Sequence, residues 1–474
     1  MSTSTLLMQM PKLNKQVLVF AVLLSGCAHE ATPRPESVVP PAQFSVVGEP
    51  AKQQWWKSFN EPALDELILR AYKANPDLTV AQARWRSARA AVAAANADLL
   101  PRLDAQVSFE SSRNSAESGR NFPGMPRRFD ILTVGGQASW ELDIWGQNKD
   151  QAQAAMAEAM AASYSADDAK IALSAEVARH WFSIQAARVE AECLAEEFKA
   201  RYREMELIEK SVNAGILASD PLSAARLAAA QAKLEETQAI QRLAALENAL
   251  RVLLGASPSE SLPPSPATTE KKTRPEFGAG VPSTLLLRRP DLMAAAAKLD
   301  AAMSREGAAR ADFYPRVTLT GQAGWQADPA SRVGRGSSGF WSLMPSIELP
   351  LFDADRRNAN LELARTEIEI AGANWRKAVL NAFREVEDSL VDLRELALQV
   401  DLAERVLVAT KDRYQNAQTR FAAGVANEQE VVIAQRDVAM ARRTYVRLEL
   451  ERCQASVRLI AATGGGWTQT GTAP

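Results

Sequence analysis

The chain has 474 residues, with 55 lysines and arginines against 57 aspartates and glutamates, so its formal net charge is −2. This balance offers no basic face and argues against a nucleic-acid partner. Three cysteines and two histidines leave little material for a metal cluster, and a mean hydropathy of −0.20 is too polar for a bundle of membrane helices. If the protein associates with a membrane, it must therefore do so through an attached lipid or through membrane-spanning β-strands.

The first 26 residues have the pattern of a bacterial lipoprotein signal peptide. Two lysines precede a short apolar run, and residues 24–27 read Leu-Ser-Gly-Cys. A positive segment, an apolar segment and small residues in this order indicate an export signal. The ending resembles a lipobox, in which Cys27 is acylated and becomes the mature N-terminus; an incidental cysteine after an ordinary signal peptide is the alternative. Residues 27–60 are then a lipidated tether, predicted to be flexible because of its prolines.

A unit of about 210 residues is duplicated in the sequence. Four landmarks recur in the same order: a proline followed by Asp-Leu, a Pro-Arg pair, a glycine that ends a long run without helix breakers, and a second such glycine. They are Pro76, Pro101, Gly215 and Gly255 in the first unit, and Pro290, Pro315, Gly424 and Gly464 in the second. This duplication predicts two equivalent repeats, residues 61–254 and 285–467. Residues 255–284 form a linker by composition, and residues 468–474 form a disordered tail.

Each repeat is predicted to run helix, strand, strand, long helix, shorter helix. The opening helices, about 62–99 and 291–312, stop at the Pro-Arg pairs. The run from Gln147 to Ala214 then has neither glycine nor proline and is rich in strong helix formers. It predicts a helix roughly 100 Å long. The corresponding run in the second repeat is Ala373 to Ala423, and the shorter helices are predicted over 222–254 and 425–463.

Four segments alternate apolar and polar residues with a period of two, which predicts strands with one apolar face. They are residues 103–110, 134–142, 317–325 and 341–349. Each has roughly the length that crosses a bilayer when tilted. Trp140, Trp325 and Trp341 lie toward the ends of these segments, where an interfacial aromatic girdle would place them. For each strand taken alone, a soluble sandwich with one wet face is the alternative.

Four strands are too few to close a barrel in a membrane. An open sheet would leave edge N–H and C=O groups unpaired in lipid, and the smallest closed membrane barrels have about eight strands. Two chains would supply eight strands and three would supply twelve, of which only the larger barrel leaves a generous lumen. The predicted fold class is therefore mainly α with membrane β, in which a duplicated chain with long helices contributes four strands to a trimeric 12-stranded β-barrel.

Further short matches extend over almost the whole chain. They are Trp55-Trp56, Phe59, Pro62 and Leu64, then Asn75-Pro76-Asp77-Leu78, the two Pro-Arg pairs, and a closing Leu459 with Gly464-Gly465-Gly466-Trp467. Together with the duplication, the lipobox and the strand pairs, they resemble the outer-membrane factor family, the TolC-like channel-tunnels, in its NodT-type lipoprotein branch. The resemblance runs from Cys27 to about Trp467.

This resemblance implies a homotrimer with a 12-stranded barrel in the outer membrane of a Gram-negative bacterium. A long α-helical barrel would extend into the periplasm, with a mixed equatorial region near residues 255–290. The implied partners are outer-membrane lipid, a periplasmic adaptor (membrane fusion protein) and an inner-membrane transporter of the resistance-nodulation-division type. The chain would be a passive efflux conduit without cofactors. A conduit for type I protein secretion is the alternative within this class.

The resemblance also places a gate at the periplasmic tip, in the turns that end the two long helices. Gly215 and Gly424 lie in these turns, where a helix C-terminus favours a residue with left-handed backbone. In relatives an acidic ring follows the second glycine and prefers cations, but the aspartate expected there is Ile433 in this chain.

Other charged residues near the turns are therefore the candidates for the gate. We expect Glu430, together with Glu428, to supply the acidic ring, with Asp220 in the other turn. Arg420 is a candidate to pair with an acid and latch the tip shut. The alternative is that these acids are solvated charges at a helix start, where the helix dipole favours them.

Two other classes of protein compete with a channel. An enzyme is disfavoured, because only His29 and His180 are available and no metalloprotease, serine-hydrolase, phosphate-binding or CxxC motif is present. A lipid-anchored structural coiled-coil protein of the periplasm would explain the helices and the tether but not the alternating segments. Cys193 and Cys453 fall in helical runs and are expected to be small buried residues, with a disulfide as the alternative.

Overall fold

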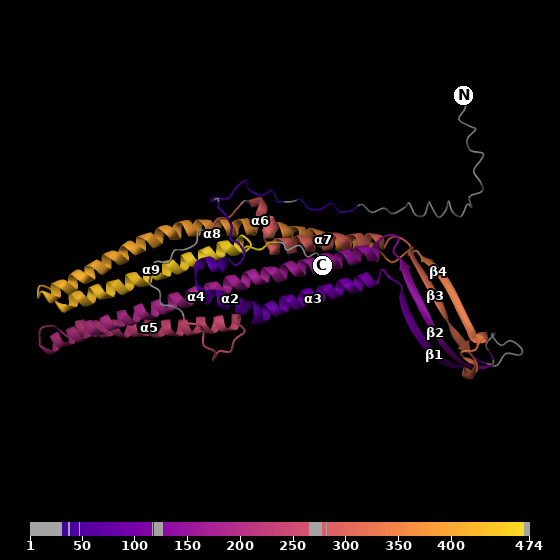
Figure 1. Cartoon of the computed structure of the whole chain (residues 1–474), viewed down its shortest axis with the longest axis horizontal. Helices are drawn as coiled ribbons and strands as arrows, with labels where there is room; N and C mark the ends of the chain where they lie inside the picture. Colours follow the sequence, from indigo (N-terminus) through magenta and orange to yellow (C-terminus); the bar gives the residue numbers. More distant parts are fainter. Residues whose placement is uncertain are drawn as a thin grey trace, which may run out of the picture. The chain divides into compact units, whose positions relative to one another are not determined.

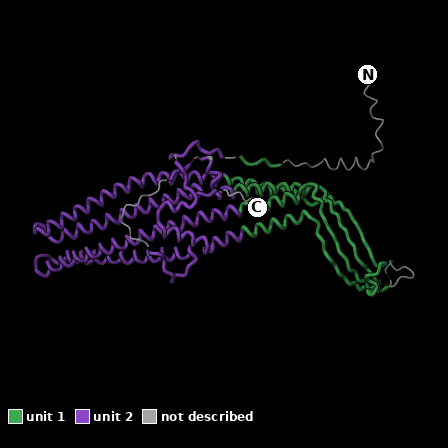
Figure 2. Tube along the Cα trace, in the orientation of Figure 1, with its two compact units in different colours: residues 1–36, 85–161, 295–375 green, residues 37–84, 162–294, 376–474 purple. Residues whose placement is uncertain are grey.

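The computed structural model describes residues 31–468 apart from 37, 47, 116, 118–126, 265–276 and 281. The predicted signal peptide, Cys27 and residues 469–474 of the predicted tail lie outside the described residues. The chain divides into two compact units, residues 1–36, 85–161 and 295–375 in unit 1 and residues 37–84, 162–294 and 376–474 in unit 2 (Figure 2). Each unit therefore draws on both halves of the duplicated sequence.

Unit 1 contains an antiparallel sheet of four strands in the order β1-β2-β3-β4 (Figure 1). The strands are β1 (Arg102–Arg113), β2 (Arg128–Leu142), β3 (Arg316–Ala327) and β4 (Gly339–Glu348). Each repeat supplies one hairpin, and the two hairpins join where β2 pairs with β3. The prediction of four strands per chain is confirmed. Within this sheet, β1 and β4 each keep one unpaired edge.

The register of the sheet gathers the predicted apolar positions on one face. One row across the strands consists of Leu103, Ala138, Gly321 and Leu343. The adjacent row faces the other way and consists of Asp104, Gln137, Gln322 and Ser342. In that row Gln322 Nε2 donates a hydrogen bond to Gln137 Oε1 at 3.2 Å. A slip of one residue would exchange the two faces, so this register is fixed by the alternation itself.

Two helical hairpins carry the long helices. Helix α4 (Gln147–Asn213) turns into α5 (Asp220–Leu253), and α8 (Arg356–Ala422) turns into α9 (Glu428–Ala462) (Figure 1). The two long helices have 67 residues each, which is about 100 Å of helix by rise. They are continuous because strong helix formers fill them and no proline lies inside. Among the described residues, no helix is both long and apolar enough to span a membrane.

The run without helix breakers predicts a helix from Ala373, but α8 begins earlier, at Arg356, and contains Gly372. A Cβ atom on Gly372 would lie 2.7 Å from Cγ of Pro35, a residue of the predicted tether. The glycine therefore serves close packing of the tether on the helix rather than a break. In unit 2 the tether is also packed: Phe44 is 2% exposed and contacts Phe383. The described part of the tether therefore packs on α8 at both of these points.

The prediction of one opening helix over residues 62–99 is wrong, because this segment is two helices, α2 (Pro62–Ala74) and α3 (Pro76–Ala97). The break falls at Asn75, whose backbone is extended with ψ 126°. Pro76 has no N–H to continue the first helix, and its ring disfavours helical backbone in the residue before it. The second repeat breaks at the corresponding point, between α6 (Pro282–Arg288) and α7 (Pro290–Ala311).

The landmarks at the two ends of the first repeat contact each other. Asn75 Nδ2 donates a hydrogen bond to the carbonyl oxygen of Leu253, at 3.0 Å, and so satisfies the C-terminal end of α5. Gly255 has φ +61°, and a Cβ atom there would collide with the carbonyl oxygen of Ala74. Glycine is thus required for two reasons, its left-handed backbone and the closeness of another backbone.

The second repeat makes the same contact with different chemistry. Arg289 Nη1 donates a hydrogen bond to the carbonyl oxygen of Ala462, at 3.1 Å, at the end of α9. Gly464 has φ +93°, and a Cβ atom there would collide with the carbonyl oxygen of Arg288. The sequence landmarks therefore recur because each pair closes a shorter helix against the kink between two opening helices.

The main core of unit 2 lies around this closure and joins α2, α4, α5 and α9. It includes Trp55, Trp56 and Phe59 of a 3₁₀ turn, η1 (Trp55–Phe59), and the fully buried Trp181. The Trp181 Nε1–H group donates to Glu61 Oε2 at 2.6 Å, so the buried indole keeps a partner.

The two cysteines in the long and short helices, Cys193 and Cys453, are both buried, and no disulfide joins them. Burial raises the pKa of the Cys193 thiol to about 11. A thiol with so high a pKa is not reactive at neutral pH. The prediction that these residues are small buried side chains is confirmed.

Replacing Gly255 by alanine should destabilise the protein more than the same change at Gly215. Both residues have positive φ, so both alanines would carry the strain of left-handed backbone, about 1–2 kcal/mol. Only the Cβ at position 255 also meets another backbone, whereas no atom lies within 4 Å of that position at Gly215. We expect a further loss of about 1–3 kcal/mol for Gly255→Ala. Unfolding followed by helical circular dichroism would test this, and equal losses for the two variants would contradict it.

Candidate gate at the turns of the helical hairpins

The two hairpin turns share one backbone geometry. Gly215 and Gly424 have φ of +71° and +74°. The residue after each glycine donates its N–H five residues back, Ile216 to Ser211 at 2.9 Å and Val425 to Arg420 at 3.0 Å. This is the hydrogen-bond pattern of a Schellman motif, which satisfies carbonyl groups at the end of a helix. The sharp reversal at each tip is therefore set by the glycine.

The two turns differ in how the returning helix begins. Asn427 is extended, and its Oδ1 accepts a hydrogen bond from the N–H of Glu430 at 2.9 Å. Ser219, at the corresponding place before α5, has helical backbone and makes no such bond. A side-chain cap stabilises the first turn of a helix by about 1 kcal/mol. The second turn is therefore the more firmly capped.

The structure places Glu430 and Arg420 across the second turn from each other. Arg420 Nη1 lies 3.2 Å from Glu430 Oε2, and the two side chains are 58% and 46% exposed. An ion pair this exposed contributes about 0–1 kcal/mol. The pair can therefore form and break without a large change in the stability of the chain.

Glu428 makes a different contact, with the other hairpin. Arg203 Nε on α4 donates to Glu428 Oε1 at 2.7 Å, and the same guanidinium lies 2.9 Å from Glu206. The hydrogen bond from Arg203 lowers the pKa of Glu428, and the two carboxylates raise the pKa of Arg203. Asp220 is exposed in the first turn of α5, and its carboxylate forms no ion pair with another described residue. The four charged gate candidates are thus not gathered into one cluster.

Ion pairs along each hairpin follow one register. In the second hairpin, Arg420–Glu430, Arg413–Asp437 and Asp392–Arg458 straddle Val425 symmetrically, with sequence separations of 10, 24 and 66 residues. In the first hairpin, Glu209–Arg226 and Arg188–Glu247 share a common midpoint, with separations of 17 and 59 residues, and the midpoint of a third pair, Glu190–Arg242, lies within two residues of it. Antiparallel helices that meet at a fixed turn must pair such positions, so the turn sets the register of the whole hairpin.

A second set of ion pairs joins the hairpins to each other, between α4 and α9. Besides Arg203–Glu428, Arg442 on α9 lies 3.4 Å from Glu192 and 3.8 Å from Glu196 on α4. Most of these side chains are between one fifth and one half exposed. Water can therefore reach the ion pairs between the two hairpins.

Sequence reasoning missed Arg203 and Asp437 as members of this region. Asp437 could have been found, because it lies as far after Val425 as Arg413 lies before it, and a helical hairpin brings such residues together. Arg203 had no local signal, because its partner is 225 residues away in the sequence.

Comparison with known proteins identifies the family. Residues 67–256 and 281–465 match the family described as outer membrane efflux protein. The chain belongs to the outer membrane efflux protein family. It is 30% identical over 471 residues to the antibiotic efflux pump outer membrane protein ArpC of Pseudomonas putida, covering 96% of both chains. It is 29% identical to the cation efflux system protein CusC of Escherichia coli O6:H1, covering 95% of this chain and 98% of that one.

Solved structures agree with this family in fold. The CmeC outer membrane channel of Campylobacter jejuni superposes with a TM-score of 0.84 at 23% identity, covering 93% of this chain and 96% of that one. A solved structure of CusC matches with a TM-score of 0.76 at 28% identity, covering 91% and 99%. This efflux protein is therefore an outer-membrane channel that extends into the periplasm, and its family is one of conduits rather than enzymes.

Replacing Asn427 by alanine should loosen the second turn selectively. The Glu430 N–H would lose its acceptor, at a cost of about 1 kcal/mol. We expect hydrogen exchange of that amide to speed up by about fivefold, since 1.4 kcal/mol corresponds to tenfold. Ser219→Ala is the matched control, because Ser219 makes no cap bond and its removal should leave exchange in the first turn unchanged. Equal acceleration in both variants would argue against a special role for the Asn427 cap.

Proposed function

We propose that the working channel is a homotrimer whose twelve strands close one β-barrel in the outer membrane. The observation that carries this proposal is the open sheet, in which β1 and β4 each have one edge without a described partner. Unpaired backbone groups are costly in lipid, so these edges must pair with strands of other copies. The apolar face of the register, with Leu103 and Leu343 exposed on it, suits contact with lipid.

The helical hairpins of the three copies would together form an α-helical barrel in the periplasm. We propose that its tip receives a periplasmic adaptor and, through it, an inner-membrane transporter of the resistance-nodulation-division type. Acylation of Cys27 would fix the N-terminus to the membrane after removal of residues 1–26. Packing of the following segment on α8, seen at Pro35 and Phe44, supports a fixed path from the lipid to the body of the protein.

The relatives are named for different cargoes. ArpC is named for antibiotics, CusC for cations, and the 30% identical OpmQ of Pseudomonas aeruginosa for pyoverdine. Relatives at similar identity thus serve chemically unrelated substrates through channels of one fold. We propose that this chain is likewise a conduit whose cargo is chosen by the inner-membrane partner.

We propose that the tip is the gate of this conduit. Gly215 and Gly424 would fix the two turns, and the Arg420–Glu430 pair would hold the second turn in its closed arrangement. Glu430 and Glu428 would supply negative charge around the opening, and Asp220 would add to it from the other turn. Support comes from the exposure of these carboxylates and from ion pairs weak enough to exchange with water.

The mass of the detergent-extracted protein should equal three chains. Multi-angle light scattering, corrected for bound detergent, measures it directly. A trimer supports a twelve-stranded barrel, because three sheets of four strands close without free edges. A stable monomer that conducts no ions in a planar bilayer would overturn the trimeric channel and favour a lipid-anchored scaffold. A trimer that secretes an unfolded protein substrate with an ATP-driven transporter would favour the type I conduit instead.

Replacing Glu430 by alanine should weaken the preference of the open channel for cations. It removes one carboxylate per chain from the tip and releases Arg420, so both changes make the opening less negative. The reversal potential of single channels in a salt gradient reports this preference, and we expect a severalfold drop in the permeability ratio together with less frequent closure. Glu430→Asp keeps the charge and is the matched control. If Glu430→Ala leaves both selectivity and closure unchanged, Glu430 is only a solvated acid at a helix start.

A further inference from the structure

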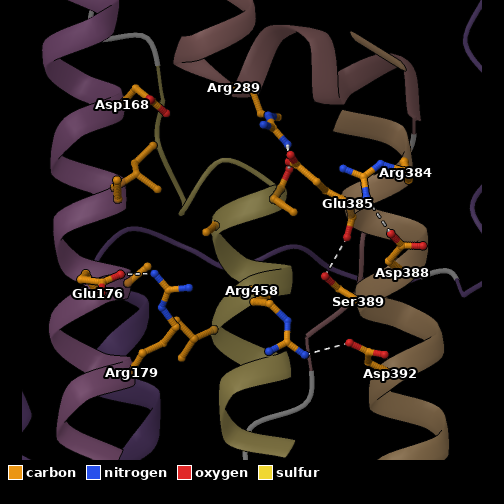
Figure 3. A pocket seen from close by; sticks show the side chains of 16 residues that line it. Asp168, Glu176, Arg179, Arg289, Arg384, Glu385, Asp388, Ser389, Asp392 and Arg458 are labelled. Carbon is orange, nitrogen blue, oxygen red and sulfur yellow. Dashed lines mark hydrogen bonds and ion pairs between the residues drawn. The ribbon is translucent and has the colours of Figure 1, made fainter. Parts of the chain in front are cut away.

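A pocket of about 550 Å³ lies in unit 2, and its lining includes no residue of either hairpin turn. Its walls come from α4, α8 and α9, with the Arg289 side chain at one end (Figure 3). Pockets of this size accommodate a drug-sized molecule. The gate proposed above does not use any of its residues.

The charged groups of the pocket are almost completely paired with one another. Arg289 Nη1 lies 2.8 Å from Glu385, Arg458 lies 2.8 Å from Asp392, and Arg384 lies 3.2 Å from Asp388. The Arg179 guanidinium is bonded to Glu176 (Figure 3). Each of the four arginines that line the pocket therefore already has a carboxylate partner. An anionic ligand would have to displace one of these carboxylates.

Asp168 is the fifth acidic residue that lines the pocket, and it differs from the other four because no arginine forms an ion pair with it among the described residues. It lies on α4, half-buried, and within the described part of the chain no hydrogen bond or ion pair involves its carboxylate. Arg289 acts on it only at longer range, and the negative charges of Asp291 and Glu385 oppose it. Burial, followed by repulsion from Asp291, raises the pKa of Asp168 to about 6. The pocket thus contains one carboxylate that no hydrogen bond or ion pair of the described residues holds.

The fold does not require this concentration of charge. In the first repeat, the neutral Asn75 performs the structural task of Arg289, since each donates a hydrogen bond to the carbonyl at the end of a shorter helix. The second repeat has replaced that amide by a guanidinium with two carboxylate partners, Asp291 and Glu385. The charged pocket is therefore an addition to the repeat rather than a condition for closing it.

The remaining wall of the pocket is apolar. Ile171 and Ala172 of α4 and Ala461 of α9 line the cavity and are at least partly exposed. These side chains offer a surface on which a hydrocarbon or aromatic body can be buried, next to the carboxylate of Asp168. One negative charge beside an apolar wall is complementary to a ligand with one positive charge and an apolar body.

We propose that this pocket binds a monovalent organic cation, with the cationic group at Asp168 and the apolar body against α4 and α9. The site is built within a single chain, so it does not depend on the trimer or on the gate.

Rhodamine 6G, a fluorescent monovalent organic cation, can test the proposal on the purified full-length protein in a neutral detergent. We expect saturable binding by fluorescence anisotropy and about a tenfold weaker affinity for Asp168→Asn, which keeps the shape of the side chain and removes its charge. Ala172→Phe, which fills the apolar part without changing any charge, should weaken binding as well. Asp412→Asn, on an exposed part of α8, is the matched control and should leave binding unchanged.

The dependence on pH gives a second readout. Protonation of Asp168 removes its charge, so wild-type binding should fall as the pH drops from 7 to 5, through its pKa of about 6. The groups that face Asp168 from α7 and α8 are Asp291 and Glu385, and both are held by Arg289. The residual binding of Asp168→Asn should change less over the same range. Equal affinity of wild type and Asp168→Asn, or equally tight binding of the anionic dye fluorescein, would overturn the proposal. Light scattering on the same samples reports the trimer separately.

Discussion

The closure of each shorter helix against a kinked pair of opening helices is the contact on which the helical part of the structure depends. It joins residues at opposite ends of a repeat, Ala74 with Gly255 and Arg288 with Gly464, and it leaves no room for a Cβ atom at either glycine. The end of each hairpin near this closure is therefore fixed by backbone packing and a buried core. At the other end each helix reverses through a glycine turn, and partly exposed ion pairs lie beside the turns. The two ends of each hairpin thus differ in how they are held, and the proposed gate lies at the end with more exposed contacts.

The strands are constrained in turn by the need to pair their backbone hydrogen-bonding groups. Each strand pairs its backbone N–H and C=O groups with its neighbour inside the sheet. The register also places apolar and polar rows on opposite faces, so a slip by one residue would expose the wrong face. The outer edges of the sheet have no such partners in the described part of the chain. A sheet with free edges is unstable in lipid, and additional copies of the same edges are the simplest partners. The need to pair backbone N–H and C=O groups in lipid therefore favours both the strand pairing within the chain and the proposed oligomer.

Much of this architecture could be predicted from local sequence patterns, because helix propensity, alternation and glycine turns act over short distances. The strands, the long helices and the duplication all follow from such patterns. The kink at Asn75 could not be separated from a continuous helix by composition alone, although Pro76 marks it. Gly372 resembles a helix breaker until Pro35 is placed beside it. The contact between Arg203 and Glu428 depends on how two hairpins pack, and no local pattern encodes it.

The two repeats have kept the same closure but no longer carry the same chemistry. Asn75 corresponds to Arg289, and the uncapped Ser219 corresponds to the capping Asn427. In both cases the first repeat has the neutral or simpler contact, and the second repeat has the additional polar one. The paired acids near the tip and the charged pocket also belong largely to the second repeat. In the proposed trimer, six similar hairpins would then alternate between two kinds. A duplicated chain can in this way separate the hairpins that mainly form the wall from those that mainly carry charge, without changing the backbone that both share.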